Sequence, residues 1–349
     1  MPGGRGRPAP SVPWSAVTEG EGASVRGDSW ERARSVLAVA GLPPGALARV
    51  RPLSGGTYNT VEELVLADGS RYVLKIPPAP ATPGLRYERR LLVSEAAFCA
   101  GAAEAGVPAP RAVSLGDDGV HLLMTACPGA PWTEAAPADG ERTGLRRELG
   151  RQVARLHRVT GPGFGYPSGA LGPLVADWRT AFTAMTDAVL ADARRYGARL
   201  PRPVDEVAGA VRAAGAALDG VTVPALVHFD LWPGNILVDR SATGEARIGG
   251  LVDGERMFWG DPLADFVSLA LLDDIGKDEA FLAGYREAGG RAGFDAEARV
   301  RLALYRAYLY LIMIVETVPR APGGDHERWV RDAVGPELEA ALDEMAELC

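Results

Sequence analysis

Hydrophobic and polar residues follow two different periods along this chain of 349 residues. Between residues 50 and 76 apolar and polar residues alternate, which indicates half-buried strands, and Asp68-Gly69 predicts a tight hairpin turn. Most of the later chain has apolar residues three and four positions apart, as amphipathic helices do. Helices are predicted at about these ranges: 28–41, 85–106, 141–158, 174–220, 262–273, 278–289, 295–318 and 325–347.

The order of these elements predicts the fold class. Residues 1–27 are rich in Gly, Pro, Arg and Ser and lack hydrophobic periodicity, so we expect a disordered arm there. The chain is 47% apolar, which is enough for a full core, and its length favours two lobes over one compact domain. We therefore expect an α+β protein with a small, sheet-rich N-lobe and a mainly helical C-lobe.

Composition excludes some classes of function. The net charge is −8, from 37 basic and 45 acidic residues, so we expect no nucleic-acid partner. The three cysteines are far apart and lack zinc-ligand spacing, which favours a reducing, cytoplasmic setting. The N-terminus lacks the apolar segment of a secretory signal, and residues 309–315, the most apolar run, are too few to span a bilayer. No membrane partner is expected.

One segment carries the strongest chemical pattern. Residues 227–239 read Val-His-Phe-Asp-Leu-Trp-Pro-Gly-Asn-Ile-Leu-Val-Asp, with the skeleton H-x-D-x-x-x-x-N before an apolar run. Asp230, on a short loop, could accept a proton from an alcohol, and Asn235 could offer its amide oxygen to Mg²⁺. Phosphoryl transfer needs both a group that orients the nucleophile and a metal that neutralises charge. A buried hairpin with Pro-Gly in its turn is the alternative.

A second apolar stretch, residues 248–252, ends close to two carboxylates, Asp253 and Glu255. A carboxylate at the mouth of a buried strand costs free energy unless it is paired or binds a metal. Asp253 is therefore a candidate second ligand of Mg²⁺, and Glu255 could support it. A solvated acidic turn is the alternative, and it suits Glu255 better than Asp253.

Lys75 lies inside the apolar strand predicted for residues 71–76. A lysine at such a position is rare unless its charge is paired, and nucleotide phosphates together with a helix glutamate would pair it. One hairpin earlier, Ser54, Gly55 and Gly56 form a loop whose backbone N–H groups could approach phosphates. The alternatives are a lysine whose head reaches solvent from an edge strand, and an ordinary turn.

The two motif segments, of the types "HGDLHPGNIL" and "IDWE…GDPLxDLA", resemble the aminoglycoside phosphotransferase family. This family is a branch of the protein-kinase-like fold that also holds choline, homoserine and fructosamine kinases. The resemblance implies that Asp230 is the catalytic base, that Asn235 and Asp253 hold Mg²⁺, and that His228 is a structural loop residue. It also implies ATP or GTP as co-substrate.

The resemblance extends to the nucleotide-binding part of the chain. It implies a helix glutamate that pairs with Lys75, for which Glu95 is the first choice and Glu88 the alternative. It also implies that hinge groups from Thr125 to Cys127 hydrogen-bond the nucleotide base. The expected division is: an N-lobe at 28–124, a hinge at 125–130, and a C-lobe at 131–349 with the catalytic segments at 226–266.

Three positions depart from the family pattern. Phe229 stands where Gly is usual, Trp232 where His is usual, and Gly254 where a bulky residue is usual. We expect these changes to alter the wall near the acceptor. An apolar or stacking wall from Phe229 and Trp232 would suit a nucleobase or a lipid-like acceptor better than a polyamine.

The expected activity is transfer of a γ-phosphoryl group to a hydroxyl of a small-molecule antibiotic, either an aminoglycoside or a drug that contains a nucleoside or sugar. The alternative is a metabolic kinase for choline, homoserine or an amino sugar. A catalytically inactive nucleotide-binding module is disfavoured because base, metal ligands and lysine are all present. A protein kinase is disfavoured because the chain has no D-F-G triplet. The protein is expected to be a monomer or a homodimer.

Overall fold

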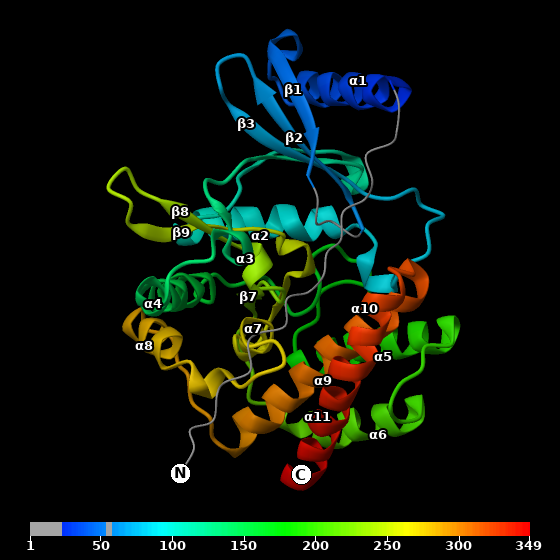
Figure 1. Ribbon diagram of the computed structural model, residues 1–349. Coiled ribbons are helices and arrows are strands. Elements are labelled where there is room, and N and C mark those ends of the chain that lie inside the picture. The colour runs from blue at the N-terminus through cyan, green and yellow to red at the C-terminus, as the bar shows by residue number, and fades with distance from the viewer. Residues whose placement is uncertain (1–22, 54–57) are drawn as a thin grey trace.

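The computed structural model describes residues 23–53 and 58–349. A sheet-rich N-terminal part lies above a larger helical part, and α2 lies between the sheet and the helices below it (Figure 1). Ser54, Gly55 and Gly56, the predicted phosphate loop, lie outside the described residues, as does the predicted arm up to residue 22.

Five antiparallel strands form the N-terminal sheet in the order β1-β2-β3-β5-β4. The predicted turn at Asp68-Gly69 joins β2 to β3, and Gly69 has a φ of +85°, which glycine adopts without strain. Apolar residues point to both faces of the sheet because a helix covers each face. The strands are β1 (Leu47–Pro52), β2 (Thr60–Leu66), β3 (Arg71–Ile76), β4 (Ala112–Leu115) and β5 (Leu122–Thr125).

The outer face of this sheet is covered by α1 (Ala23–Val39) (Figure 1). The prediction that residues 23–27 belong to an arm is wrong, because the helix already begins at Ala23. Its apolar side packs on the sheet, so burial stabilises a helix that propensity alone would leave marginal. The buried cluster under it consists of Ala33, Val36, Leu37, Leu47, Leu64, Leu66, Leu74 and Leu123.

The inner face is covered by α2 (Leu91–Ala105), which begins later than the predicted start at residue 85. A separate 3₁₀ turn, Arg86–Glu88, precedes it, and Arg90 then adopts a left-handed φ of 63°. Tyr87 in this turn is 1% exposed and belongs to the core of the helical part. Tertiary packing of the turn therefore overrides the helical period of the sequence.

The helical part is built around α9 (Ala296–Arg320), which is capped by Asp295. By length and composition α9 could cross a membrane, but 61% of its most apolar window is buried inside the protein, as in a core helix. The predicted helix at 174–220 is two helices, and the one at 325–347 is interrupted by a π turn. The helices are α3 (Trp132–Ala135), α4 (Asp139–Leu156), α5 (Trp178–Tyr196), α6 (Val204–Ala214), α7 (Leu263–Leu269), α8 (Glu279–Glu287), α10 (Gly324–Trp329) and α11 (Gly335–Leu348).

Two short antiparallel sheets bring the two motif segments together. In one, β8 pairs with β9 and β6, and in the other β7 pairs with β10. The N–H of Val252 donates to the carbonyl of Asn235 at 3.0 Å, so the acidic segments meet at one end of the β8–β9 hairpin. These strands are β6 (Ala130–Pro131), β7 (Ala225–Val227), β8 (Ile236–Arg240), β9 (Ala246–Leu251) and β10 (Phe258–Gly260).

Candidate active site

The loop after β7 carries Asp230, and a carboxylate of α7 fixes the path of this loop. Asp265 is fully buried and accepts the backbone N–H groups of His228 at 3.1 Å and Phe229 at 2.6 Å. Hydrogen bonds from backbone donors stabilise a buried carboxylate and order the chain that supplies them. Asp265 therefore builds the loop without reaching the reacting atoms.

His228 links the two motif segments. Its Nε2 lies 3.0 Å from the carbonyl oxygen of Val252, and its Nδ1 accepts the N–H of Asp230 at 3.2 Å. A carbonyl can only accept, so these bonds assign the proton to Nε2. The ring is fully buried and packs edge-on against Phe98. His228 thus has the structural position that the resemblance implied.

The Asp230 side chain lies at the edge of the buried region and is 21% exposed. The amide nitrogen of Asn235 donates to its backbone oxygen at 2.9 Å and to Oδ2 at 3.1 Å. Burial raises the pKa of the Asp230 carboxyl, and attraction to Arg256 partly opposes this rise. Among the described residues no hydrogen-bond donor meets Oδ1. This oxygen is therefore free to accept a hydrogen bond.

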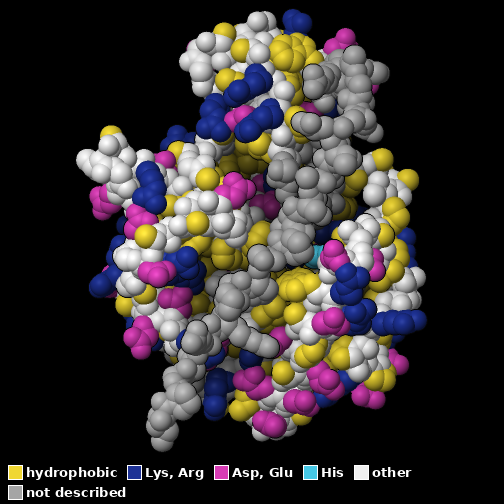
Figure 2. Space-filling model, viewed as in Figure 1, with side chains coloured by type: hydrophobic (Ala, Val, Ile, Leu, Met, Phe, Trp, Pro, Cys, Tyr) yellow, Lys and Arg dark blue, Asp and Glu magenta, His cyan; other side chains and the backbone are white. Residues whose placement is uncertain are grey.

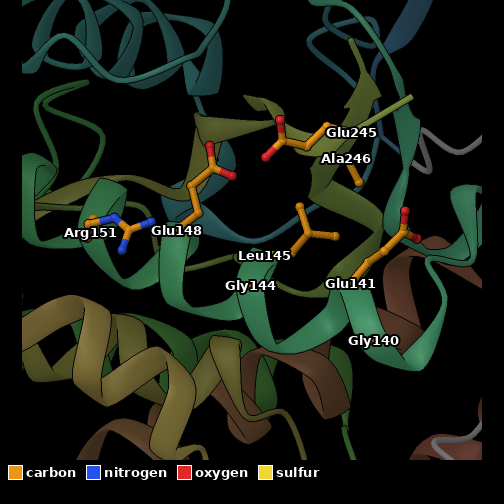
Figure 3. Close-up of a pocket in the computed structure, with 8 residues that line it drawn as sticks. All are labelled: Gly140, Glu141, Gly144, Leu145, Glu148, Arg151, Glu245 and Ala246. Carbon is orange, nitrogen blue, oxygen red and sulfur yellow. The ribbon is translucent and has the colours of Figure 1, made fainter. Parts of the chain in front are cut away.

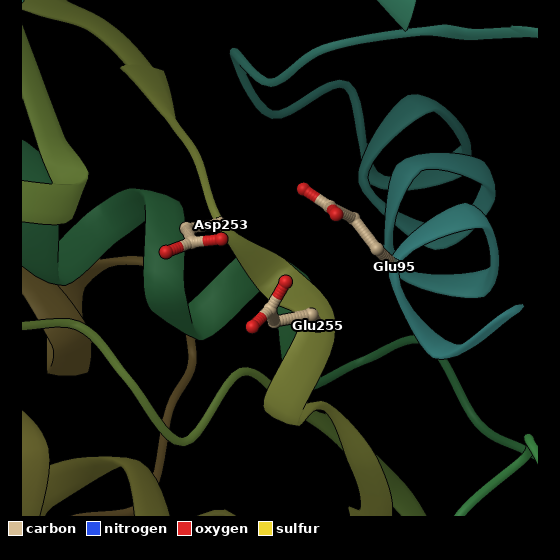
Figure 4. Close-up of side chains that lie close together, drawn as sticks. All are labelled: Glu95, Asp253 and Glu255. Atoms are coloured by element: carbon tan, nitrogen blue, oxygen red, sulfur yellow. The ribbon is translucent and has the colours of Figure 1, made fainter. Parts of the chain in front are cut away.

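Three carboxylates surround Lys75 Nζ on the inner face of β3. Nζ lies 2.7 Å from Glu95, 2.5 Å from Asp253 and 3.5 Å from Glu255. Burial lowers the pKa of Lys75, but attraction to Asp253, Glu95 and Glu255 outweighs burial and raises it well above its usual range. Asn59 donates to Glu255 at 2.6 Å, which ties the start of β2 to the cluster. Figure 4 shows the three acids converging from α2 and from the turn after β9.

The oxygens of this cluster fit a divalent cation. Glu95, Asp253 and Glu255 each place an oxygen within 4.8 Å of the others. Oε2 of Glu95 is buried and has no hydrogen-bond partner among the described residues. Asn235 uses its amide nitrogen in the bonds to Asp230, which leaves its oxygen, the atom that Mg²⁺ prefers, for a ligand. Asn235 lies opposite Val252, the residue before Asp253. Asn235 and Asp253, the predicted ligands of Mg²⁺, therefore fit this site as well.

Glu88, the alternative partner of Lys75, lies elsewhere. It belongs to the 3₁₀ turn before α2, where its Oε2 accepts the N–H of Leu85 at 2.6 Å and its Oε1 accepts a bond from Arg320. The structure thus pairs Lys75 with Glu95, because only Glu95 is on the helix that faces β3.

The predicted hinge follows β5. The N–H of Thr125 donates to Arg111 at 2.9 Å, and the N–H of Ala126 donates to Arg71 at 3.0 Å, so both amides are used inside the sheet region. No backbone bond of the described chain uses the N–H of Cys127. Of these three amides, only that of Cys127 therefore lacks a backbone acceptor within the described chain.

The three departures from the family pattern have different structural consequences. Phe229 is fully buried between Phe258 and Tyr308, so the expectation that it lines the acceptor wall is wrong. Trp232 is half-buried and covers Gly234, where an added Cβ would lie 2.2 Å from the indole.

Gly254 is compensated from another element. A Cβ at Gly254 would lie 2.3 Å from the ring of Phe98 on α2, so that ring fills the space of the bulky residue. Gly254 was expected to alter the wall near the acceptor. Instead, its missing side chain makes room for a contact with α2.

Sequence reasoning gave no role to several residues around these groups. Asp265 and Asn59 hold the loop and the cluster, and Arg256 and Glu316 form a buried ion pair next to Asp230. A signal existed for Glu316, since a carboxylate directly after Ile314 and Val315 interrupts the apolar face of a helix. Arg256 carried a similar signal before Met257 and Phe258.

Other charged features lie outside this site. A pocket of about 360 Å³ lies between α4 and the start of β9 (Figure 3). Its Glu141 pairs with Arg240, and its Glu148 accepts the N–H of Ile248, so these acids already have partners.

Basic side chains also gather on the sheet-rich part (Figure 2). There Arg49, Arg51 and Arg71 surround the buried Glu63. Burial alone would raise the pKa of Glu63, but the arginines, above all Arg71, lower it.

Comparison with solved structures identifies relatives of this fold. A candidate fructosamine-3-kinase from Thermobifida fusca has a TM-score of 0.67 and 22% identity, over 90% of this chain and 99% of that one. A choline/ethanolamine kinase family protein from Mesorhizobium loti has a TM-score of 0.54 and 23% identity, over 91% and 99%. The macrolide 2'-phosphotransferase MphH from Brachybacterium faecium has a TM-score of 0.55 and 22% identity, over 88% and 98%.

These likenesses confirm the predicted two-lobed, protein-kinase-like fold class. The profile of the phosphotransferase enzyme family matches residues 49–303, which is more than half of the chain and includes Lys75, Asp230 and Asp253. The chain therefore belongs to the phosphotransferase enzyme family.

Proposed function

We propose that this protein transfers the γ-phosphoryl group of ATP or GTP to a hydroxyl of a sugar- or nucleoside-containing antibiotic, such as an aminoglycoside. The observation that carries the chemistry is the meeting of two groups at one end of the β8–β9 hairpin. One group is Asp230, whose side chain accepts a hydrogen bond from Asn235. Asn235 accepts the N–H of Val252, which directly precedes Asp253. Asp253 is one of the acids around Lys75, the other group.

In this proposal Lys75 binds nucleotide phosphates while Glu95 keeps its ammonium group in place. Lys75 must then exchange its 2.5 Å contact with Asp253 for the phosphates. Asn235 and Asp253 would hold Mg²⁺, which neutralises charge on the β and γ phosphates. Cys127 would bind the base from a hinge at 125–130, between an N-lobe at 28–124 and a C-lobe at 131–349.

Asp230 orients the acceptor and receives its proton. Its Oδ1 would accept a hydrogen bond from the acceptor hydroxyl, whose oxygen then faces the γ-phosphorus in line with the leaving group. Position and charge supply most of the rate, because phosphoryl transfer needs little covalent chemistry from the protein.

The acceptor class rests on the surroundings of the loop. Trp232 follows Asp230 by two residues in the same loop and is half-buried, and an aromatic ring there would suit a sugar or nucleobase ring. This supports an antibiotic acceptor. A metabolic kinase for an amino sugar, choline or homoserine is the second candidate, and the TM-score of 0.67 with the candidate fructosamine-3-kinase favours the amino sugar among these.

A coupled nucleotide-release assay tests the proposal. Mg-ATP and Mg-GTP are offered with aminoglycosides, macrolides, nucleoside antibiotics, choline, homoserine and amino sugars, and Asp230→Asn serves as the isosteric control. Turnover on one drug class that the variant loses by about 100-fold or more supports antibiotic phosphorylation. Turnover on metabolites alone selects the second candidate. Full activity of Asp230→Asn contradicts the role of Asp230.

A further inference from the structure

Arg256 is a largely buried arginine close to Asp230. It ends the 3₁₀ turn Gly254–Arg256, and its side chain is 12% exposed. Its Nε lies 3.9 Å from Oδ2 of Asp230, and its Nη2 donates to Oε2 of Glu316 at 3.0 Å. One guanidinium group thus contacts the proposed base and a carboxylate of α9 together.

The position of Arg256 is set by groups other than Asp230. Glu316 also pairs with Arg320 at 3.3 Å, and Arg320 in turn pairs with Glu88. Acidic and basic side chains therefore alternate from the turn before α2, through the end of α9, to Arg256. Removing one member of such a chain leaves an uncompensated buried charge, which is costly. The guanidinium of Arg256 is consequently fixed before any acceptor binds.

The two oxygens of Asp230 have different surroundings. Oδ2 accepts the amide N–H of Asn235 at 3.1 Å. The same oxygen lies 3.9 Å from Nε of Arg256. Within the described chain Oδ1 meets no donor. A fixed cation and a fixed amide on one oxygen hold the carboxylate plane, and they leave the other oxygen without a donor from the described residues.

We propose that Arg256 is a positioning residue for phosphoryl transfer, which holds Oδ2 of Asp230 so that Oδ1 meets the acceptor hydroxyl. This inference rests on the proposed function. In the reaction the acceptor O–H bond breaks and its proton passes to Oδ1. The acceptor oxygen bonds to the γ-phosphorus, and the bond from that phosphorus to the bridging oxygen breaks and releases the nucleoside diphosphate. Arg256 exchanges no proton in this step.

A double-mutant cycle between Arg256→Gln and Asp230→Asn tests the inference, with kcat and both KM values measured on the best acceptor. Misplacement of a reacting group by about 1 Å costs on the order of 100-fold in rate, so we expect Arg256→Gln to lower kcat by about 10- to 100-fold. Both KM values should stay within about 3-fold of wild type, because in this proposal Arg256 acts through Asp230 and not on either substrate. In the Asp230→Asn background the same change should lower kcat by less than about 3-fold.

Two further variants separate positioning from general destabilisation. Arg256→Lys keeps a positive charge beside Oδ2 and should recover part of the kcat that Arg256→Gln loses. Arg146→Gln is the matched control, because Arg146 is 18% exposed and pairs with Asp278 at 2.6 Å far from Asp230 along the chain. We expect it to lower the melting temperature without changing kcat.

The outcomes distinguish the two proposals. If wild type turns over but Arg256→Gln and Asp230→Asn act additively, Arg256 does not work through Asp230 and this inference is overturned alone. The same conclusion holds if Arg256→Lys, once shown to be folded by circular dichroism, is as slow as Arg256→Gln. If wild type transfers phosphate to no acceptor and hydrolyses no nucleotide, the proposed function fails and this inference fails with it.

Discussion

The backbone N–H of Phe229 donates a 2.6 Å hydrogen bond to Oδ1 of Asp265, although Phe229 has a left-handed φ of 64°. Such a φ is strained for a residue with a side chain, which explains why glycine is usual at this position of the resembled family. Here the bond to Asp265 and the burial of the ring between Phe258 and Tyr308 offset the strain. The loop of Asp230 is therefore held by contacts that reach α7 and α9.

This strain reverses the usual order of two substitutions. Removal of the Phe229 ring should destabilise the protein by about 3–5 kcal/mol. Glycine avoids the left-handed penalty of about 1–2 kcal/mol that alanine keeps, so Phe229→Gly should be at least as stable as Phe229→Ala in urea unfolding. Phe182 in α5 is the control, because there the glycine variant should be about 1 kcal/mol less stable than the alanine variant. The same order at both sites would contradict the strain.

Asp265→Asn should loosen the loop of Asp230. An amide has one accepting oxygen, so its NH₂ group would face donors such as the N–H of His228 or Nε2 of His157. We expect a loss of about 2–4 kcal/mol in unfolding free energy and a lower kcat. Asp273→Asn, at an exposed acid shortly after α7, is the control and should change neither quantity. An Asp265→Asn enzyme with wild-type kcat would argue against this role.

Glu255 predicts a pH dependence of stability. Burial and then repulsion by Asp253 raise its pKa to about 8, above its ordinary value. The folded state therefore holds a proton that the unfolded state releases at lower pH. Its contribution is fully present below the ordinary pKa of a glutamate and is lost as pH rises towards 8. Unfolding free energies measured from pH 5 to 8 should fall less steeply for Glu255→Gln than for wild type. Glu339→Gln, on the exposed side of α11, should leave the slope unchanged.

Gly254→Ala should disturb the contact between the acidic turn and α2. The new Cβ would lie 2.3 Å from the ring of Phe98, and overpacking of this kind costs about 1–3 kcal/mol. Displacement of α2 would also move Glu95 from Lys75, so the KM for nucleotide should rise. The pair Gly254→Ala and Phe98→Leu should recover much of the loss in thermal melting. If the double variant is as unstable as the sum of the singles, the ring contact is not the cause.

Magnesium should stabilise the nucleotide complex through Asp253. Mg-ATP should raise the melting temperature of wild type more than ATP with EDTA does, because ligands that bind only the folded state stabilise it. Asp253→Asn should lose this difference while still responding to ATP alone through Lys75. The control Asp239→Asn changes another acid of the same hairpin, one that already pairs with Arg247. An undiminished effect of Mg²⁺ in Asp253→Asn would contradict its role as a ligand.

The sequence determined the class of the fold and the chemical groups of the site. The alternation at residues 50–76 and the later helical periods are local signals, so they survive without tertiary information. The same holds for Lys75 in an apolar strand and for the spacing from Asp230 to Asn235. Helix boundaries were predicted less accurately. The helix predicted from residue 28 begins at Ala23, and the one predicted from residue 85 begins at Leu91. Each boundary depends on tertiary packing.

Tertiary structure decided which of these groups meet. From the sequence, either Glu88 or Glu95 could pair with Lys75. The structure pairs Lys75 with Glu95. The left-handed Arg90 separates Glu88 from α2, and Glu88 pairs with Arg320 instead. It also gave no means to see that Phe229 turns into the core. Nor could local patterns join Arg256 to Glu316, which are 60 positions apart, because long-range ion pairs depend on how α9 packs under the hairpins. Short sequence segments supply the chemical groups of the site. The orientation of these groups depends on distant residues that only the packed core brings together.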